Sequence, residues 1–172
     1  MHKRLPSTFV ILLSATALVA IGGCGQTRVS PTPGDFPSEP VAARQTLFDF
    51  FESLNAGDFA RAVDLYSGSY EIMIDHNPAI DPDDHAALLR AACTINGAVC
   101  LKVDSAQLAD STEPMDGQFM FQVRFRNDDG SAFRQKPCCG ADAGEGQEVF
   151  QFRVVQVAEH LFQVADSPIY MP

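Results

Sequence analysis

The chain has 172 residues, of which 22 are acidic and 12 are basic, and its formal net charge at pH 7 is −10. Domains mostly run about 100 to 150 residues, so this length accommodates one domain with appended segments. The acidic surplus disfavours nucleic acid and anionic lipid surfaces as partners, because binding of either requires a basic face. We therefore expect no nucleic-acid partner.

Residues 1–23 have the pattern of a secretion signal. A basic start precedes an apolar run from Phe9 to Ile21, which is too short to span a membrane comfortably as a permanent helix. The run ends in Ile21-Gly22-Gly23-Cys24, which resembles the bacterial lipobox, where the cysteine receives a diacylglyceryl group and becomes the mature N-terminus. We expect a lipid on Cys24; an ordinary signal peptide or an anchor helix is the alternative.

Residues 24–40 are predicted to be the lipidated cysteine and a flexible linker. Residues 25–40 hold four prolines and two glycines and almost nothing to bury, a composition typical of tethers. The protein would then be exported and lipid-anchored to the outer face of the cell membrane or to the outer membrane. Without Lys3 and Arg4, the mature chain has a net charge of about −12 with its histidines neutral.

Two amphipathic helices are predicted between Arg44 and Gly68. The apolar residues of the first recur at helical spacing: Leu47, Phe50, Phe51 and Leu54. The second repeats such a face: Phe59, Ala62, Val63 and Tyr66. Between them, Gly57 suits a left-handed residue after a helix end, and Asp58 can accept the first free amides of the second helix.

A strand, a loop and a third helix are predicted between residues 69 and 97. Alternation over Ser69 to Ile74 favours the strand, although the second helix could continue for a few residues instead. A loop follows from Asp75 to Ile80. Asp81 is then expected to cap the third helix, with Pro82 in its first position, and this helix ends near Cys93 to Gly97.

From residue 99 onward the pattern is all β. The expected strands are Val99–Leu108, Gln118–Arg126, Ser131–Lys136, Val149–Val157 and Leu161–Tyr170, with turns at Asn127–Gly130 and Ala158–His160. The fold class is therefore α+β over residues 41–172. We expect a bent antiparallel sheet with about three N-terminal helices packed on its concave face.

The helical opening resembles the NTF2-like superfamily, also called SnoaL-like or cystatin-like. The resemblance rests on Leu54-Asn55-Ala56-Gly57-Asp58-Phe59, followed by Ala62 and Leu65-Tyr66, and the rest of the chain to Pro172 agrees only in its order of elements. It implies a cone-shaped sheet with the helices inside its bend. The chain is also similar to uncharacterised bacterial lipoproteins of this fold, which implies no function.

Enzymes of that superfamily, steroid isomerases and polyketide cyclases among them, work in a pocket between helices and sheet with an acidic general base. By this resemblance, Asp75 or His76 would be the base, and Tyr66 and Tyr70 would line the pocket. The sequence departs from the isomerase pattern, in which the aspartate directly precedes a proline. Here Asn77 holds that place, and an amide cannot act as a base.

Four cysteines remain besides the lipidated one, and export allows them to oxidise. Cys93 and Cys100 flank a natural chain reversal, so a disulfide between them is the favoured single bond. Cys138 and Cys139 are adjacent in a glycine-rich loop, and a bond between neighbours is strained. Pairing of either with Cys93 or Cys100 therefore stays open.

No metal site and no cofactor are expected. The cysteine spacing lacks the paired C-x₂-C units of structural zinc sites. The acid-rich stretch from Asp75 to His85 lacks EF-hand spacing, and helix capping explains most of its aspartates.

These patterns favour a protein that acts by binding a small molecule or another envelope protein. The alternative is an isomerase or cyclase that uses Asp75 or His76, and a structural spacer is a third class. The interior of the cone distinguishes them: converging polar groups favour the enzyme, an open apolar cavity favours a carrier, and a filled interior favours a protein partner.

Overall fold

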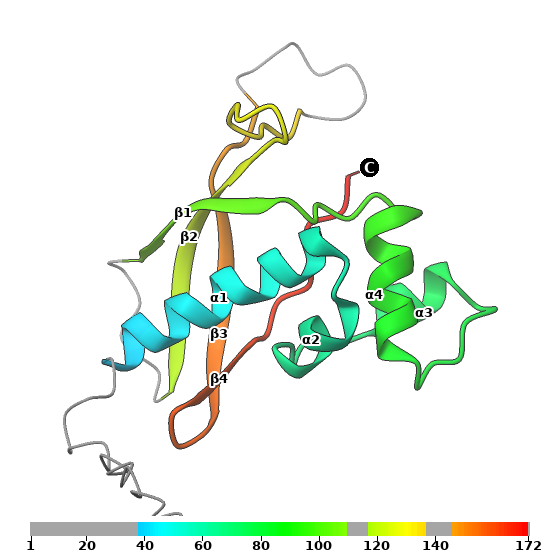
Figure 1. Cartoon of the computed structure of the whole chain (residues 1–172), viewed down its shortest axis with the longest axis horizontal. Coiled ribbons are helices and arrows are strands. Elements are labelled where there is room, and N and C mark those ends of the chain that lie inside the picture. The colour runs from blue at the N-terminus through cyan, green and yellow to red at the C-terminus, as the bar shows by residue number, and fades with distance from the viewer. Residues whose placement is uncertain (1–37, 110–116, 137–145, 172) are drawn as a thin grey trace, which may run out of the picture. The chain divides into compact units, whose positions relative to one another are not determined.

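The structure, a computed structural model, describes residues 38–109, 117–136 and 146–171. The expected signal, Cys24, almost all of the linker, Cys138 and Cys139 lie outside the described residues. Four helices are followed by four strands (Figure 1): α1 (Glu39–Ala56), α2 (Phe59–Asp64), α3 (Glu71–His76), α4 (His85–Thr94), β1 (Lys102–Leu108), β2 (Gln118–Arg126), β3 (Phe150–Ala158) and β4 (Leu161–Val164). None of the described helices is long and apolar enough to cross a membrane.

The strands form one antiparallel sheet in the order β1-β2-β3-β4. The sheet curls into a half-barrel (Figure 1). Register shifts after Val103 and after Gln156 add local twist, because an extra residue on one strand bends it. Alternate residues of β2 are buried on the inner face: Phe119, Phe121, Val123 and Phe125. The fold is therefore α+β with a bent antiparallel sheet, as the sequence predicts.

Helix α1 lies against the inner face of the sheet and contacts all four strands. Its apolar positions at helical spacing are buried: Ala43, Leu47, Phe50, Phe51 and Leu54. The helix ends as expected, because Gly57 takes a left-handed conformation at φ 78° and its N–H bonds to Leu54 O. Asp58 then caps α2, since its Oδ1 accepts the N–H of Arg61 at 3.2 Å.

The other helices correct the expected layout. The described residues form four helices rather than about three, and α2, α3 and α4 pack mainly on one another and on α1 instead of on the sheet. Helices α2 and α3 have only six residues each. Together with α4 they form a helical corner beyond one end of the sheet (Figure 1).

The predicted strand over Ser69 to Ile74 is wrong, because residues 71–76 form α3. The Oγ of Ser69 accepts the N–H of Glu71 at 3.2 Å, and Ile74 N bonds to Tyr70 O at 2.9 Å, which starts a helical turn. The expected cap of α4 also moves. Asp84 caps it by accepting the N–H of Ala87 at 3.0 Å, whereas Asp81 holds the preceding turn by accepting the N–H of Asp83.

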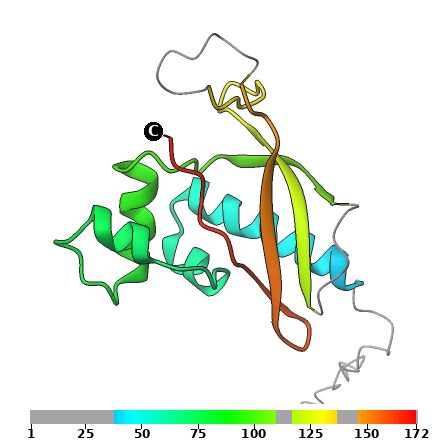
Figure 2. The ribbon, with the colours of Figure 1, turned by 180° about the vertical axis from the view of Figure 1, so that it is seen from behind.

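Three expected strands are shorter than predicted, and the one expected from Val99 begins only at Lys102. Ser131 to Lys136 contributes only isolated bridges, at Ala132 and Gln135. Strand β4 ends at Val164, and the chain then crosses to the helical corner, where Tyr170 bridges Ala98 (Figure 2). The turns at Asn127–Gly130 and before Leu161 are present as predicted.

Candidate functional site

Three tyrosines gather where the helical corner meets the C-terminal segment. The rings of Tyr66 and Tyr70 meet edge to face with their centroids 5.1 Å apart. The phenols of Tyr70 and Tyr170 both lie close enough to that of Tyr66 to disfavour its ionisation. We call these three residues the tyrosine cluster. It contains both tyrosines that the resemblance implies to be pocket-lining, Tyr66 and Tyr70, and adds Tyr170, which no sequence pattern indicates.

Tyr66 holds a fixed position in the cluster. Its side chain is 5% exposed, its ring stacks on Phe50 with the centroids 5.6 Å apart, and its hydroxyl donates to Ser69 O at 3.0 Å. Gly68 lies so close that a side chain there would collide with the Tyr66 ring and with Ala165 O. The ring and the hydroxyl of Tyr66 therefore both have their contacts within the domain.

The hydroxyls of Tyr70 and Tyr170 are buried but have no hydrogen-bond partner among the described residues. The Tyr70 ring lies flat on His85, with a centroid distance of 4.0 Å and an interplanar angle of 6°. A buried polar group without a partner costs about 1 to 3 kcal/mol. Each of these two hydroxyls can donate a hydrogen bond that no described residue accepts.

Burial keeps the cluster protonated. It raises the pKa of Tyr66 far above 10.0, with smaller contributions from Tyr70, Tyr170 and Asp166, and it raises the pKa of Tyr70 to about 12. Burial also raises the pKa of Tyr170. At neutral pH the cluster offers O–H donors and no phenolate base. Below pH 10 these tyrosines are protonated in both the folded and the unfolded chain. As the pH rises from 10 towards 12, the free energy of unfolding falls, because the tyrosines of the unfolded chain ionise first.

Replacing Tyr70 by Phe should leave the free energy of unfolding unchanged or raise it by up to about 1 kcal/mol, because the change removes an unsatisfied buried donor. Tyr66→Phe is the matched control and should lower it by about 1 kcal/mol, since a satisfied hydrogen bond is lost. Urea denaturation measures both. Equal losses in the two variants would show that the Tyr70 hydroxyl is bonded in solution.

Asp75 and His76, the candidate bases, lie on α3 and are both exposed. The ring of His76 meets the ring of Tyr170 edge to face, with their centroids 5.5 Å apart. Asp75 lines none of the surface cavities described below. The Asn77 amide is structural, because it donates to Met73 O at 2.7 Å and to Asn96 Oδ1 at 2.9 Å. The geometry thus leaves Asp75 exposed to solvent rather than sheltered.

Phenylalanine rings fill the space between α1 and the sheet. Phe51 packs edge to face against Phe50, Phe125 and Phe152, with centroid distances of 5.1, 4.8 and 5.0 Å. All four rings are at most 1% exposed. Among the described residues, this part of the interior is close-packed apolar core without converging polar groups.

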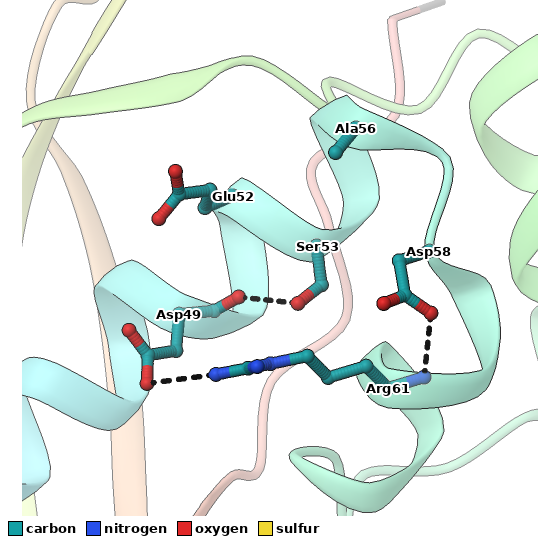
Figure 3. Close-up of a pocket in the computed structure, with 6 residues that line it drawn as sticks. All are labelled: Asp49, Glu52, Ser53, Ala56, Asp58 and Arg61. Carbon is teal, nitrogen blue, oxygen red and sulfur yellow. Dashed lines mark hydrogen bonds and ion pairs between the residues drawn. The ribbon is translucent and has the colours of Figure 1, made fainter.

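A hollow of about 310 Å³ lies where α1 meets α2 (Figure 3), lined by Asp49, Glu52, Ser53, Ala56, Asp58 and Arg61. Arg61 Nη2 lies 3.4 Å from Asp49 Oδ2, and Ser53 Oγ donates to Asp49 O at 2.7 Å. Most of its polar groups are therefore satisfied by the two helices themselves. The hollow is an open surface junction between α1 and α2.

Two further hollows border α1. One of about 180 Å³ lies beside Phe48, Glu52, Lys102 and Val103. The other, of about 360 Å³, lies between the beginning of α1 and the end of β1 and is mostly apolar. Both open at the surface, so neither is an enclosed chamber inside the cone.

A disulfide joins Cys93 and Cys100, with an S–S distance of 2.00 Å, and links the end of α4 to the segment before β1. It is the pairing that the sequence favours. Its loop is short, so its expected contribution to stability is about 2 kcal/mol. Within the described ranges, no group of three or more His, Cys, Asp or Glu residues is arranged to hold a metal ion.

No protein-family model, no curated protein and no solved structure gives a significant match to this chain.

Proposed function

We propose that the chain is a lipid-anchored, extracytoplasmic NTF2-like domain that binds a protein partner of the cell envelope. The fold-family part is supported by the order of elements, a helical opening followed by a curled antiparallel sheet. The residues that carry the resemblance, Leu54 to Phe59, form the turn between α1 and α2, in which Gly57 ends α1 and Asp58 caps α2. The membrane address rests on the sequence around Cys24 alone.

The filled interior favours a protein partner over a small-molecule ligand held inside the domain. A ligand carrier needs a concave site that buries most of its ligand. Here Phe51 and its neighbours occupy the bend of the sheet, and the cavities found along α1 open at the surface. Because the interior is filled, such a domain would bind a partner through its outer surface.

Two other functions have less support. The buried, unpartnered hydroxyls of Tyr70 and Tyr170 favour a small polar ligand at the tyrosine cluster as the second candidate. An isomerase or cyclase that uses Asp75 or His76 requires a sheltered base within reach of a substrate, and both side chains are exposed.

Native mass spectrometry of the full chain, extracted from its own membranes, tests the proposal. We expect a mature chain that begins at Cys24 with the mass of its acyl groups, in a complex with a second protein. The double variant Asp75→Asn, His76→Ala should give the same complex, because neither side chain takes part. As a second readout, labelled palmitate should enter the wild-type chain but not Cys24→Ser.

Other results of this experiment would contradict the proposed partner or the proposed anchor. A lone chain would overturn the partner, and a small-molecule adduct lost in Tyr70→Phe and Tyr170→Phe would establish the second candidate. A chain that retains residues upstream of Cys24 and carries no acyl mass would overturn the anchor.

A further inference from the structure

An apolar groove lies between the beginning of α1 and the end of β1, and we call it the α1–β1 groove. It has a volume of about 360 Å³ and is lined by Pro40, Val41, Arg44, Ala106, Gln107, Leu108 and Phe121. Phe121 is only 1% exposed, whereas Val41 is 50% and Leu108 is 48% exposed. Two large apolar side chains therefore flank a hollow at the surface.

The side chains that line the groove are mostly apolar. Among the described residues that line it, Arg44 alone is charged, and it lies one helical turn from Val41. Leu108 pairs with Phe121 across β1 and β2, so its side chain belongs to the inner, apolar face of the sheet but lies at the end that α1 leaves uncovered. A surface of this composition favours contact with an apolar partner.

The chain enters the domain beside this groove. Residue 38 precedes α1, and Pro40 and Val41 belong to the first turn of the helix. Ser38 follows Cys24 by 14 positions in the sequence. A segment of this length can reach no further than about 50 Å. A lipid on Cys24 would therefore hold this end of the domain close to the membrane surface.

We propose that the α1–β1 groove rests on the membrane that carries the anchor, with Val41 and Leu108 inserted at the boundary between head groups and acyl chains. This inference depends on the proposed lipid on Cys24. The Arg44 guanidinium extends to the lipid phosphates while its stem covers apolar surface. The lipid is zwitterionic, because a mature chain with a net charge of about −12 is repelled by an anionic surface.

The chain contains no tryptophan, so a single introduced indole reports on its own position. Val41→Trp places the indole at the groove, and Ile95→Trp is the control, because Ile95 is 76% exposed at the end of α4 in the helical corner. The lipidated full-length variants are reconstituted into phosphatidylcholine vesicles with and without brominated acyl chains. The Val41→Trp variant should lose fluorescence about two-fold in brominated vesicles and emit at shorter wavelength, whereas the Ile95→Trp variant should do neither.

A second indole position tests whether the quenching of Val41→Trp reflects the groove rather than the indole itself. Leu108→Trp should be quenched like Val41→Trp, and the added change Val41→Asp should abolish that quenching, because a carboxylate is excluded from the acyl region. Equal, weak quenching of the Val41→Trp and Ile95→Trp variants on anchored protein would overturn the proposal. So would blue-shifted but unquenched emission from Val41→Trp, which would indicate cover by another part of this chain or by a second copy. Protein that does not float with the vesicles would instead refute the anchor.

Discussion

Phe51→Ala should lower the free energy of unfolding by about 3 to 5 kcal/mol, the usual cost of deleting a fully buried phenylalanine. Phe51 is 0% exposed and contacts rings from three directions: Phe50 on α1, Phe125 on β2 and Phe152 on β3. Fixed backbone elements surround the ring, so the site cannot collapse fully around the smaller side chain. A cavity would remain between α1 and the sheet.

Urea denaturation of Phe51→Ala and Phe48→Ala measures this effect against a matched control. Phe48 lies on the same helix but is only partly buried beside the core, so its replacement should cost clearly less. Equal losses in the two variants would contradict a close-packed interior. In that case, the proposal of a surface-binding domain would lose its main support.

The sequence predicts α1 and β2 well because each has one strongly apolar face. Leu47 to Leu54 keeps the helical period over two turns, and Phe119 to Phe125 alternates without interruption. The sequence does not predict helix α3, because Ser69 to Ile74 is too short for the helical period to be distinguished from the strand period. Tertiary packing decides it: Met73 is buried, whereas Ile72, on the face expected to be apolar, is 52% exposed.

In the candidate site, too, local sequence patterns predict some features and tertiary packing decides the others. Tyr66 and Tyr70 lie four residues apart, and their proximity could be predicted from sequence. Tyr170 joins them only because the chain after β4 turns away from the sheet, which leaves Ile169 O to accept Val99 N at 2.7 Å. No local pattern predicts that crossing. The resemblance makes Asp75 a candidate base in a pocket, but Asp75 lies on α3, in place of the end of the expected strand, and is exposed to solvent.

Gly68→Ala should lower the free energy of unfolding by about 3 kcal/mol, because the added methyl group has no room. A Cβ at this position would lie 2.5 Å from both Ala165 O and Tyr66 Cζ, and closer still to Tyr66 Oη. The Ala165 backbone cannot yield easily, since its N–H bonds to Arg153 O on β3 at 2.9 Å. Gly130→Ala is the control: its surroundings are open, so only its left-handed φ of 84° costs energy, about 1 kcal/mol.

A double-mutant cycle between Gly68→Ala and Tyr66→Phe should give a coupling of about 1 kcal/mol, because the effects of residues in contact are not additive. Tyr66→Phe removes the Oη atom nearest to the new methyl group and frees the ring from its hydrogen bond to Ser69 O. Gly68→Ala should therefore cost less in the Tyr66→Phe background, although the clash with Ala165 O persists. Gly130→Ala should show no coupling to Tyr66→Phe. If Gly68→Ala cost the same in both backgrounds, the close approach of Gly68 to Tyr66 would not limit the packing of the tyrosine cluster.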